Sequence, residues 1–406
     1  MGTKIVQILA ATLFLATSQA QDATAVAAPE SSSPPISTTR KREVIKATPG
    51  PWGSLEYYQI PLECPREYLN FLTTPSQQVA WHFAAKSREE LDTILLKAGL
   101  TSVEISMALK GASILNDPEA MRVFPTDDAI LGISHETRVK LYHLLARSDG
   151  NRYYQRPIYI DSENLSYWFE GSSVPRSAIQ DVAKLAYPTP HGRGYFLADL
   201  PFTLRQASTA LEERQLLVGL LRQQGLIVRL RLTRDSLSPE IADYWNAGYK
   251  NKAVMPILES VVQANDGGAI DIAHLLPATP RQYLNRFPTP ADGVHGRFPD
   301  WFWTCYNFFR FAPREIYADS PEREALIFTE FERSLPPLQF GDMLLLNSGN
   351  KIIHGCIFVA DDIAFTKNGA DLFSPWVLMK IEDIVAYHDL VGDVTLSVFR
   401  KLQPAP

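Results

Sequence analysis

Cysteine, excess basic charge and long apolar runs are all scarce in this sequence. Only three of its 406 residues are cysteines, and none forms a Cys-x-x-Cys pair. The His-x-x-x-His and His-x-Asp spacings typical of metal sites are absent as well. We therefore expect the histidines of the middle region to be structural or surface residues; they are His82, His135, His143, His191 and His274.

Cationic residues do not outnumber anionic ones. Lys and Arg total 39 and Asp and Glu total 45, which gives a formal net charge of −6 and a pI near 5.8. No run of Lys or Arg could follow a phosphate backbone, so we expect no nucleic-acid partner. Beyond the first 20 residues no apolar stretch is long enough for a membrane span, so we expect a soluble mature protein.

The N-terminus has the pattern of a secretory signal peptide. Lys4 supplies a positive start, residues 5–16 form a short apolar run, and Ser18-Gln19-Ala20 is a small-x-small cleavage site. We predict that residues 1–20 are removed and that the protein is exported to the periplasm or the extracellular space. A buried N-terminal helix is the alternative. Residues 21–52 are rich in Ala, Ser, Thr and Pro and predict a disordered linker.

The region before residue 290 contains two kinds of pattern. Residues 53–150 predict a helical module, with helix starts at Ser87, Thr101 and Ser134. Residues 151–290 predict an α+β region of unassigned role, with strands at 157–160, 194–198 and 226–232 and helices at 177–185, 203–223, 254–263 and 280–287. Linker composition at 288–293 ends this region. The length favours two or three domains, so we predict a multidomain α+β fold.

The most informative stretch is Trp303-Thr304-Cys305-Tyr306-Asn307-Phe308-Phe309. The run from Cys305 to Ala312 is apolar enough to be a buried helix that Cys305 opens. Further along, His354 begins a β-branched run that is typical of a strand. A helix N-terminus and a nearby imidazole both stabilise a thiolate. The pattern therefore predicts a nucleophile, Cys305, with His354 as its general base.

The order of these segments resembles a known family. A Cys helix, a Gly-Asp strand at Gly341-Asp342-Met343-Leu344-Leu345, a His-Gly strand at 354–359 and a short return strand are similar to the NlpC/P60 group of papain-like cell-wall peptidases. The resemblance covers roughly residues 291–403. In that family the Cys usually follows Asp and precedes Ser-Gly, whereas here it lies in Thr304-Cys305-Tyr306.

The resemblance implies a C-terminal papain-like domain at residues 291–406, with a nucleophile helix packed on a small antiparallel sheet. It also implies that the protein uses no metal and no organic cofactor. The expected partners are peptidoglycan peptides or another peptide substrate.

A third residue orients the imidazole in such a site, because a polar partner at one ring nitrogen fixes the tautomer. The resemblance places this residue within 365–369. Asn368 has the most suitable chemistry, a carbonyl acceptor for a ring N–H. Thr366 is the second choice by position, and Lys367 is a poor orienter because it only donates. The structural alternative is a tight turn at Asn368-Gly369.

The cysteines leave alternatives open, because an oxidising compartment favours a disulfide. Cys356 follows His354 by two residues, so their side chains share one face of a strand. A disulfide between Cys305 and Cys356 would silence the site, and Cys64 could pair with either. We predict that Cys305 is the free thiol and that Cys356 is a small buried apolar residue.

These patterns predict an exported cysteine hydrolase that cleaves amide bonds by thiolate attack. Its catalytic residues would be Cys305, His354 and Asn368. The oxyanion hole would combine the Cys305 N–H with a donor from upstream or nearby aromatic residues; the candidates are Trp301, Trp303 and Tyr306. Two alternatives remain: a non-catalytic cell-envelope binding or scaffold protein with a degenerate papain-like domain, and a thiol acyltransferase.

Overall fold

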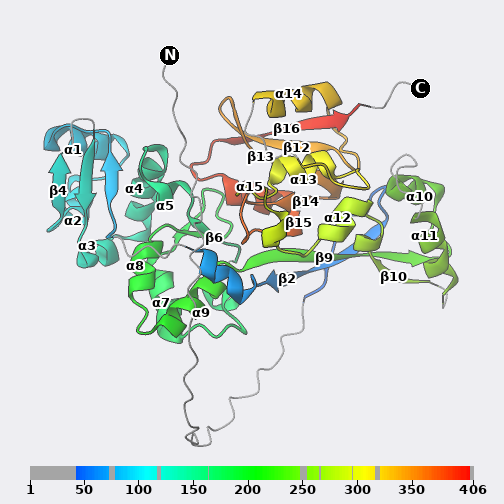
Figure 1. The fold of residues 1–406 in the computed structure, drawn as a ribbon, viewed down its shortest axis with the longest axis horizontal. Helices are drawn as coiled ribbons and strands as arrows, with labels where there is room; N and C mark the ends of the chain where they lie inside the picture. The colour runs from blue at the N-terminus through cyan, green and yellow to red at the C-terminus, as the bar shows by residue number, and fades with distance from the viewer. Residues whose placement is uncertain are drawn as a thin grey trace, which may run out of the picture. The chain divides into compact units, whose positions relative to one another are not determined.

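A computed structural model describes residues 43–72, 78–116, 120–162, 164–246, 254–264, 267–294, 296–315 and 321–402. The predicted signal peptide and residues 21–42 of the predicted linker lie outside the described residues. Four antiparallel sheets and the helices between them make this a mixed α+β fold (Figure 1). In the part of the chain that the structure describes, we find no helix with the length and apolarity of a membrane span.

The first sheet joins strands that are far apart in the sequence. Strand β9 is its centre and matches the strand predicted at 226–232, because Leu226, Val228, Leu230 and Leu232 are all buried. It pairs with β2 from Ser54 to Leu62. The sheet has the order β1-β2-β9-β10 and consists of β1 (Ile45–Lys46), β2 (Ser54–Leu62), β9 (Gln223–Thr233) and β10 (Gly267–Asp271).

The predicted helical module contains a sheet as well as helices. The helix starts are as predicted: the Ser87 hydroxyl accepts a hydrogen bond from the Glu90 N–H, and Thr101 and Glu104 form a capping box. The added sheet has the order β3-β5-β4. The elements are η1 (Arg66–Phe71), β3 (Trp81–Phe83), α1 (Arg88–Lys97), α2 (Ser102–Ala108), β4 (Ser113–Asn116), β5 (Met121–Phe124), α3 (Asp127–Gly132), α4 (His135–Arg147) and α5 (Arg152–Gln155).

The middle region departs from prediction at one helix. The helix expected at 203–223 is two helices, α8 and α9, because Thr209 caps a new helix by accepting a hydrogen bond from the Glu212 N–H. A small sheet has the order β6-β8-β7. The elements are β6 (Ile158–Ile160), α6 (Leu165–Trp168), α7 (Arg176–Leu185), β7 (Tyr187–Pro188), β8 (Tyr195–Leu197), α8 (Leu200–Arg205), α9 (Ala210–Leu220), α10 (Pro239–Asn246), α11 (Val254–Gln263), η2 (Ile272–His274), α12 (Ala278–Tyr283) and η3 (Pro290–Asp292).

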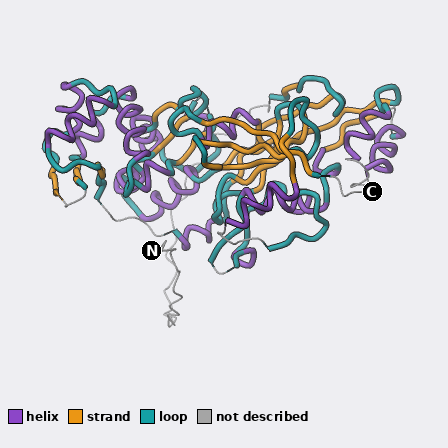
Figure 2. Tube along the Cα trace, turned by 90° about the horizontal axis from the view of Figure 1, so that it is seen from above, coloured by secondary structure: helices purple, strands orange, loops and turns teal. Residues whose placement is uncertain are grey.

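The C-terminal residues form a six-stranded antiparallel sheet in the order β11-β16-β12-β13-β14-β15. Helices flank its strands (Figure 2). The Gly-Asp strand, the His-Gly strand and the return strand that the sequence predicts are β12, β13 and β14. The elements are α13 (Trp301–Asn307), α14 (Pro321–Glu330), β11 (Phe331–Arg333), β12 (Met343–Ser348), β13 (Lys351–Ala360), β14 (Ile363–Lys367), β15 (Trp376–Lys380), α15 (Ile381–His388) and β16 (Val394–Lys401).

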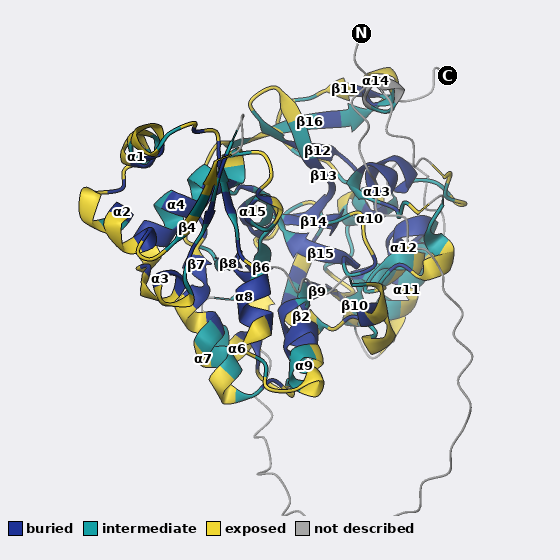
Figure 3. Ribbon diagram, turned by 60° about the vertical axis from the view of Figure 1, so that its left-hand side comes forward, coloured by how far each residue is buried: buried dark blue, intermediate teal, exposed yellow. Residues whose placement is uncertain are grey.

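Two hydrophobic cores lie on opposite faces of this sheet, and its central strands are buried on both (Figure 3). Leu344 and Cys356 pack in the core that includes α1, α4 and α9. Leu345 and Ile357 pack in the core that includes β2, β9 and α13. Each core thus contains residues from both sides of residue 290. The domain boundary predicted there crosses both cores, so the packing does not separate the two parts.

Candidate functional site

Cys305 lies inside a helix and not at its start. The N-cap of α13 is Asp300, whose carboxylate accepts a hydrogen bond from the Trp303 N–H at 3.0 Å. Only the first four N–H groups of a helix are free to stabilise an anion, and Cys305 is the fifth residue of α13. The helix-start environment expected for Cys305 is therefore absent. The prediction that Cys305 opens the helix is wrong. Asp300 is a better N-cap than Thr304 or Cys305, so the helix begins before Cys305.

The Cys305 side chain is enclosed and neutral. It is 3% exposed and lies in an apolar core. Burial raises the pKa of the Cys305 thiol well above its ordinary value, and the neighbouring Cys356 and Asp300 raise it further. The thiol has no hydrogen-bond partner among the described residues. A thiolate has no support in this environment.

The structure brings His354 and Cys305 to opposite faces of the six-stranded sheet. Gly355 faces α13, because a Cβ built on it would lie 2.6 Å from the Trp301 ring. Neighbouring residues of a strand point to opposite faces, so the His354 side chain leaves β13 on the face opposite to the one that Gly355 presents to α13, although the edge of the helix still reaches it: the Trp301 and His354 ring centroids are 6.4 Å apart. The His354 ring stacks on His388 of α15, with 3.8 Å between ring centroids. The backbone of β13 thus lies between the predicted nucleophile and the predicted base.

A polar chain runs from His354 along the α15 face of the sheet. The His354 Nε2 lies 2.9 Å from the Thr366 hydroxyl, which donates to the Asn368 Oδ1 at 3.0 Å. The Asn368 Nδ2 donates to the Met379 sulfur, so the Oδ1 of the same amide faces Thr366. Because Oδ1 can only accept, the Thr366 hydroxyl proton is used in the hydrogen bond to Asn368. The Thr366 oxygen must then accept from His354, which puts the imidazole proton on Nε2. Asn368 therefore acts on His354 only through Thr366, the residue that the sequence ranked second.

His388 stacks on His354, although its distance along the sequence from the expected catalytic strand gave no reason to place it in the site. Burial lowers the pKa of His354 well below its ordinary value, and His388 lowers it further. Burial also lowers the pKa of His388, to about 3. The His388 Nε2 is buried and has no hydrogen-bond partner within the described ranges. Both rings are neutral at physiological pH, and no sequence spacing indicates a contact between a strand and a helix this far apart.

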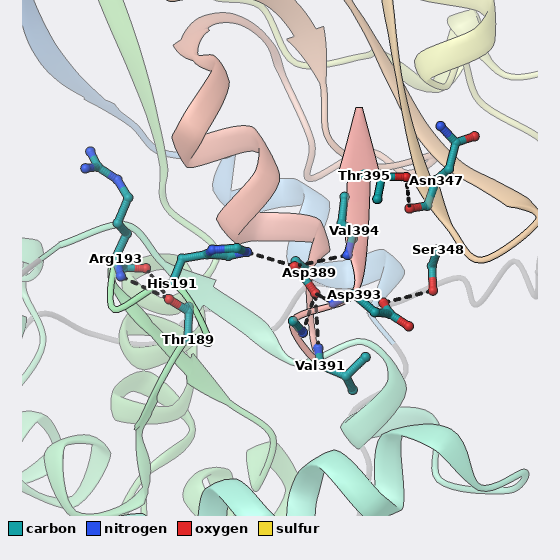
Figure 4. Close-up of polar contacts among 11 residues, drawn as sticks. Thr189, His191, Arg193, Asn347, Ser348, Asp389, Val391, Asp393, Val394 and Thr395 are labelled. Carbon is teal, nitrogen blue, oxygen red and sulfur yellow. Dashed lines mark hydrogen bonds and ion pairs between the residues drawn. The ribbon is translucent and has the colours of Figure 1, made fainter. Parts of the chain in front are cut away.

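A loop from the middle region holds the end of α15 in place (Figure 4). The carboxylate of Asp389, directly after His388, accepts hydrogen bonds from four backbone N–H groups at residues 391–394. The His191 Nε2 lies 2.7 Å from the same carboxylate. Arg193 of this loop pairs with Asp383 at 2.8 Å and with Glu382 at 3.0 Å. His191 and Arg193 of this loop thus connect the middle region to α15.

The remaining predictions concern the disulfide alternatives and the aromatic residues of the oxyanion hole. Cys64, Cys305 and Cys356 are all buried and free, and the proposed disulfide partners Cys305 and Cys356 lie in the two opposite cores. Among the aromatic candidates for an oxyanion hole, the Tyr306 hydroxyl donates to Glu330 at 2.6 Å. The Trp303 Nε1 is buried and unpartnered in the described part of the chain. Neither has a ring contact with His354, whereas the ring of the third candidate, Trp301, lies 6.4 Å from the His354 ring, measured between centroids.

A search of the described residues for groups of three or more His, Cys, Asp or Glu that could hold a metal ion finds none. Comparison of the chain with protein-family models, curated proteins and solved structures gave no match.

Proposed function

We propose that this protein is an exported, non-catalytic binding protein of the cell envelope. In this proposal the C-terminal part is a papain-like domain that has no working thiol site. The order of α13, β12, β13 and β14 supports the relationship, because it follows the order of segments on which the resemblance to NlpC/P60 peptidases rests. The resemblance also suggests the ligand class, which is peptides of the cell wall.

One observation carries the choice of a binding protein over an enzyme: Cys305 and His354 lie on opposite faces of one sheet. A cysteine hydrolase and a thiol acyltransferase both need a thiolate within hydrogen-bond reach of its base. Here the thiol is enclosed with a raised pKa, and the imidazole is neutral with its Nε2 committed to Thr366. Either reaction would require α13 and β13 to repack.

Thiol labelling of the native protein tests this proposal. An activated cysteine alkylates with iodoacetamide at about pH 6, whereas an ordinary thiol has a pKa near 8.5 and barely reacts there. We expect no labelling of Cys305 in the native protein at about pH 6, and full labelling in denaturant at about pH 8.5 as the control that the thiol is present and reduced. Rapid native labelling of Cys305 that His354→Ala abolishes would return the protein to the hydrolase class.

Two further measurements address ligand and location. Purified peptidoglycan should retain the protein, and Cys305→Ala should bind it equally well; release of peptides by the wild type but not by Cys305→Ala would contradict the proposal. N-terminal sequencing of the exported form should begin at Gln21, because cleavage is predicted after Ala20.

A further inference from the structure

A cavity of about 170 Å³ lies far along the chain from the Cys305 and His354 segments. It is bordered by residues 78–80 before β3, by His82 of β3, by residues 150–154 at the start of α5 and by Ala198 and Pro201 near α8. Pockets for drug-sized ligands have volumes of roughly 300 to 1,000 Å³. This cavity is smaller, so it suits a molecule of only a few heavy atoms.

Three side chains at the cavity have hydrogen-bonding groups that no other described residue satisfies. They are the Gln78 amide, the Arg152 guanidinium and the Tyr153 hydroxyl. All three can donate, and Arg152 also carries a full positive charge. None of the described residues that line the cavity is Asp or Glu. Gln78 and Arg152 are exposed, so water solvates these groups until a ligand replaces it, and the donors favour a ligand that accepts hydrogen bonds and is negatively charged.

The cavity wall is rigid. The Asn151 side chain joins the start of α5 to β3: its Oδ1 accepts from the His82 N–H at 2.9 Å and its Nδ2 donates to the His82 carbonyl at 2.8 Å. Gly150 has a φ of +87°, and a Cβ there would lie 2.9 Å from the His82 ring, so only glycine fits. The loop that presents Arg152 is thus fixed before any ligand arrives, which lowers the entropy cost of binding.

Tyr154 is fixed in the same way by a buried polar network. Its hydroxyl accepts from the Trp81 Nε1 at 2.8 Å and donates to the Asp199 carboxylate at 3.1 Å. Asp199 is fully buried and paired with Arg138 at 2.6 Å. Both hydrogen bonds of the Tyr154 hydroxyl are thus made within the protein, and Tyr154 contributes the apolar surface of its ring to the cavity. Val79, Ala80, Ala198 and Pro201 extend this apolar surface.

We infer that this cavity binds a small organic carboxylate. The carboxylate accepts hydrogen bonds from Arg152, Tyr153 and Gln78, and the apolar body of the molecule lies against the Tyr154 ring and the aliphatic residues beside it. Binding is non-covalent and leaves the ligand unchanged. The inference does not depend on the proposed cell-wall function, because it uses none of the residues of that site.

Matched ligands and matched variants test the inference in the full-length protein. Benzoate and propionate are the probes, and benzamide and propionamide are their uncharged counterparts of nearly equal size. Arg152 is exposed, so Arg152→Gln removes the charge without disturbing a core. Arg156→Gln is the control, because Arg156 is also exposed and ends the same helix but does not line the cavity. Titration calorimetry and saturation-transfer NMR measure the affinities.

We expect at least one carboxylate to bind about tenfold or more tightly than its amide, a difference of about 1.4 kcal/mol. Arg152→Gln should remove that preference, whereas Arg156→Gln should keep it. The inference is overturned if neither carboxylate binds saturably at concentrations up to about 10 mM. It is equally overturned if Arg152→Gln and Arg156→Gln weaken binding to the same extent.

Discussion

The stacked imidazoles of His354 and His388 should make the protein sensitive to mild acid. Both rings are neutral in the folded protein because burial lowers their pKa, to about 3 for His388. An unfolded histidine has a pKa near 6.5. The unfolded chain therefore binds more protons below about pH 6.5. The stability that the neutral rings contribute is complete above that pH and is lost as the pH falls.

As long as the pKa of each folded ring stays below the pH of the experiment, the loss of unfolding free energy depends only on the pKa of an unfolded histidine. Each pH unit below about 6.5 costs about 1.4 kcal/mol per ring, which gives about 2 kcal/mol per ring at pH 5. The pair should therefore lose about 4 kcal/mol of unfolding free energy between about pH 7.5 and pH 5. That is a large share of the 5 to 15 kcal/mol typical of a folded protein, so it should be measurable.

His388→Phe isolates the contribution of one ring. A phenyl ring keeps the stacking surface, and the His388 Nε2 that it replaces has no partner among the described residues. The variant should lose about 2 kcal/mol less than the wild type over this pH range. Urea unfolding at several pH values measures the difference, with His135→Gln, an exposed histidine, as the control. An acid-induced loss equal to that of the wild type would refute the assignment of buried neutral rings.

Asp161 should have the opposite effect on stability. Burial and the nearby Asp383 raise its pKa in the folded protein to about 7, above that of an unfolded aspartate. The folded protein therefore loses stability as the pH rises from about 4 to about 7. Asp161→Asn should therefore raise the melting temperature at about pH 8 but not at about pH 4, whereas Asp181→Asn, whose side chain pairs with Lys184 on an exposed helix surface, should change neither. Residues 291–406 expressed alone should lack cooperative unfolding by circular dichroism, because both faces of their sheet lose the cores they pack against; a cooperative transition would show that this part folds independently.

Local features of the fold could be predicted from the sequence, and the candidate site could be predicted only in part. Hydrogen-bonding caps at Ser87 and Thr101 and the alternation of β9 are local, so they were identified correctly. The break before α9 also had a local signal, the Thr209 and Glu212 spacing, which the apolar periodicity concealed. The predicted contact between Cys305 and His354 required helix α13 to cover the face of β13 that carries His354. Strand periodicity shows that His354 and Cys356 share a face, but it does not say which helix lies over that face.

The position of β16 determines when this protein can fold. Strand β16, the last strand among the described residues, pairs with β12 on one side and β11 on the other, and its Phe399 shares a core with Leu55 of β2. The sheet cannot be completed until Val394–Lys401 have been synthesised, and contacts of such long sequence separation form slowly. Until β16 has been synthesised, β11 and β12 lack the strand that pairs with both of them. In an exported protein, as we propose this one to be, that delay keeps the chain in the form that a translocation channel accepts.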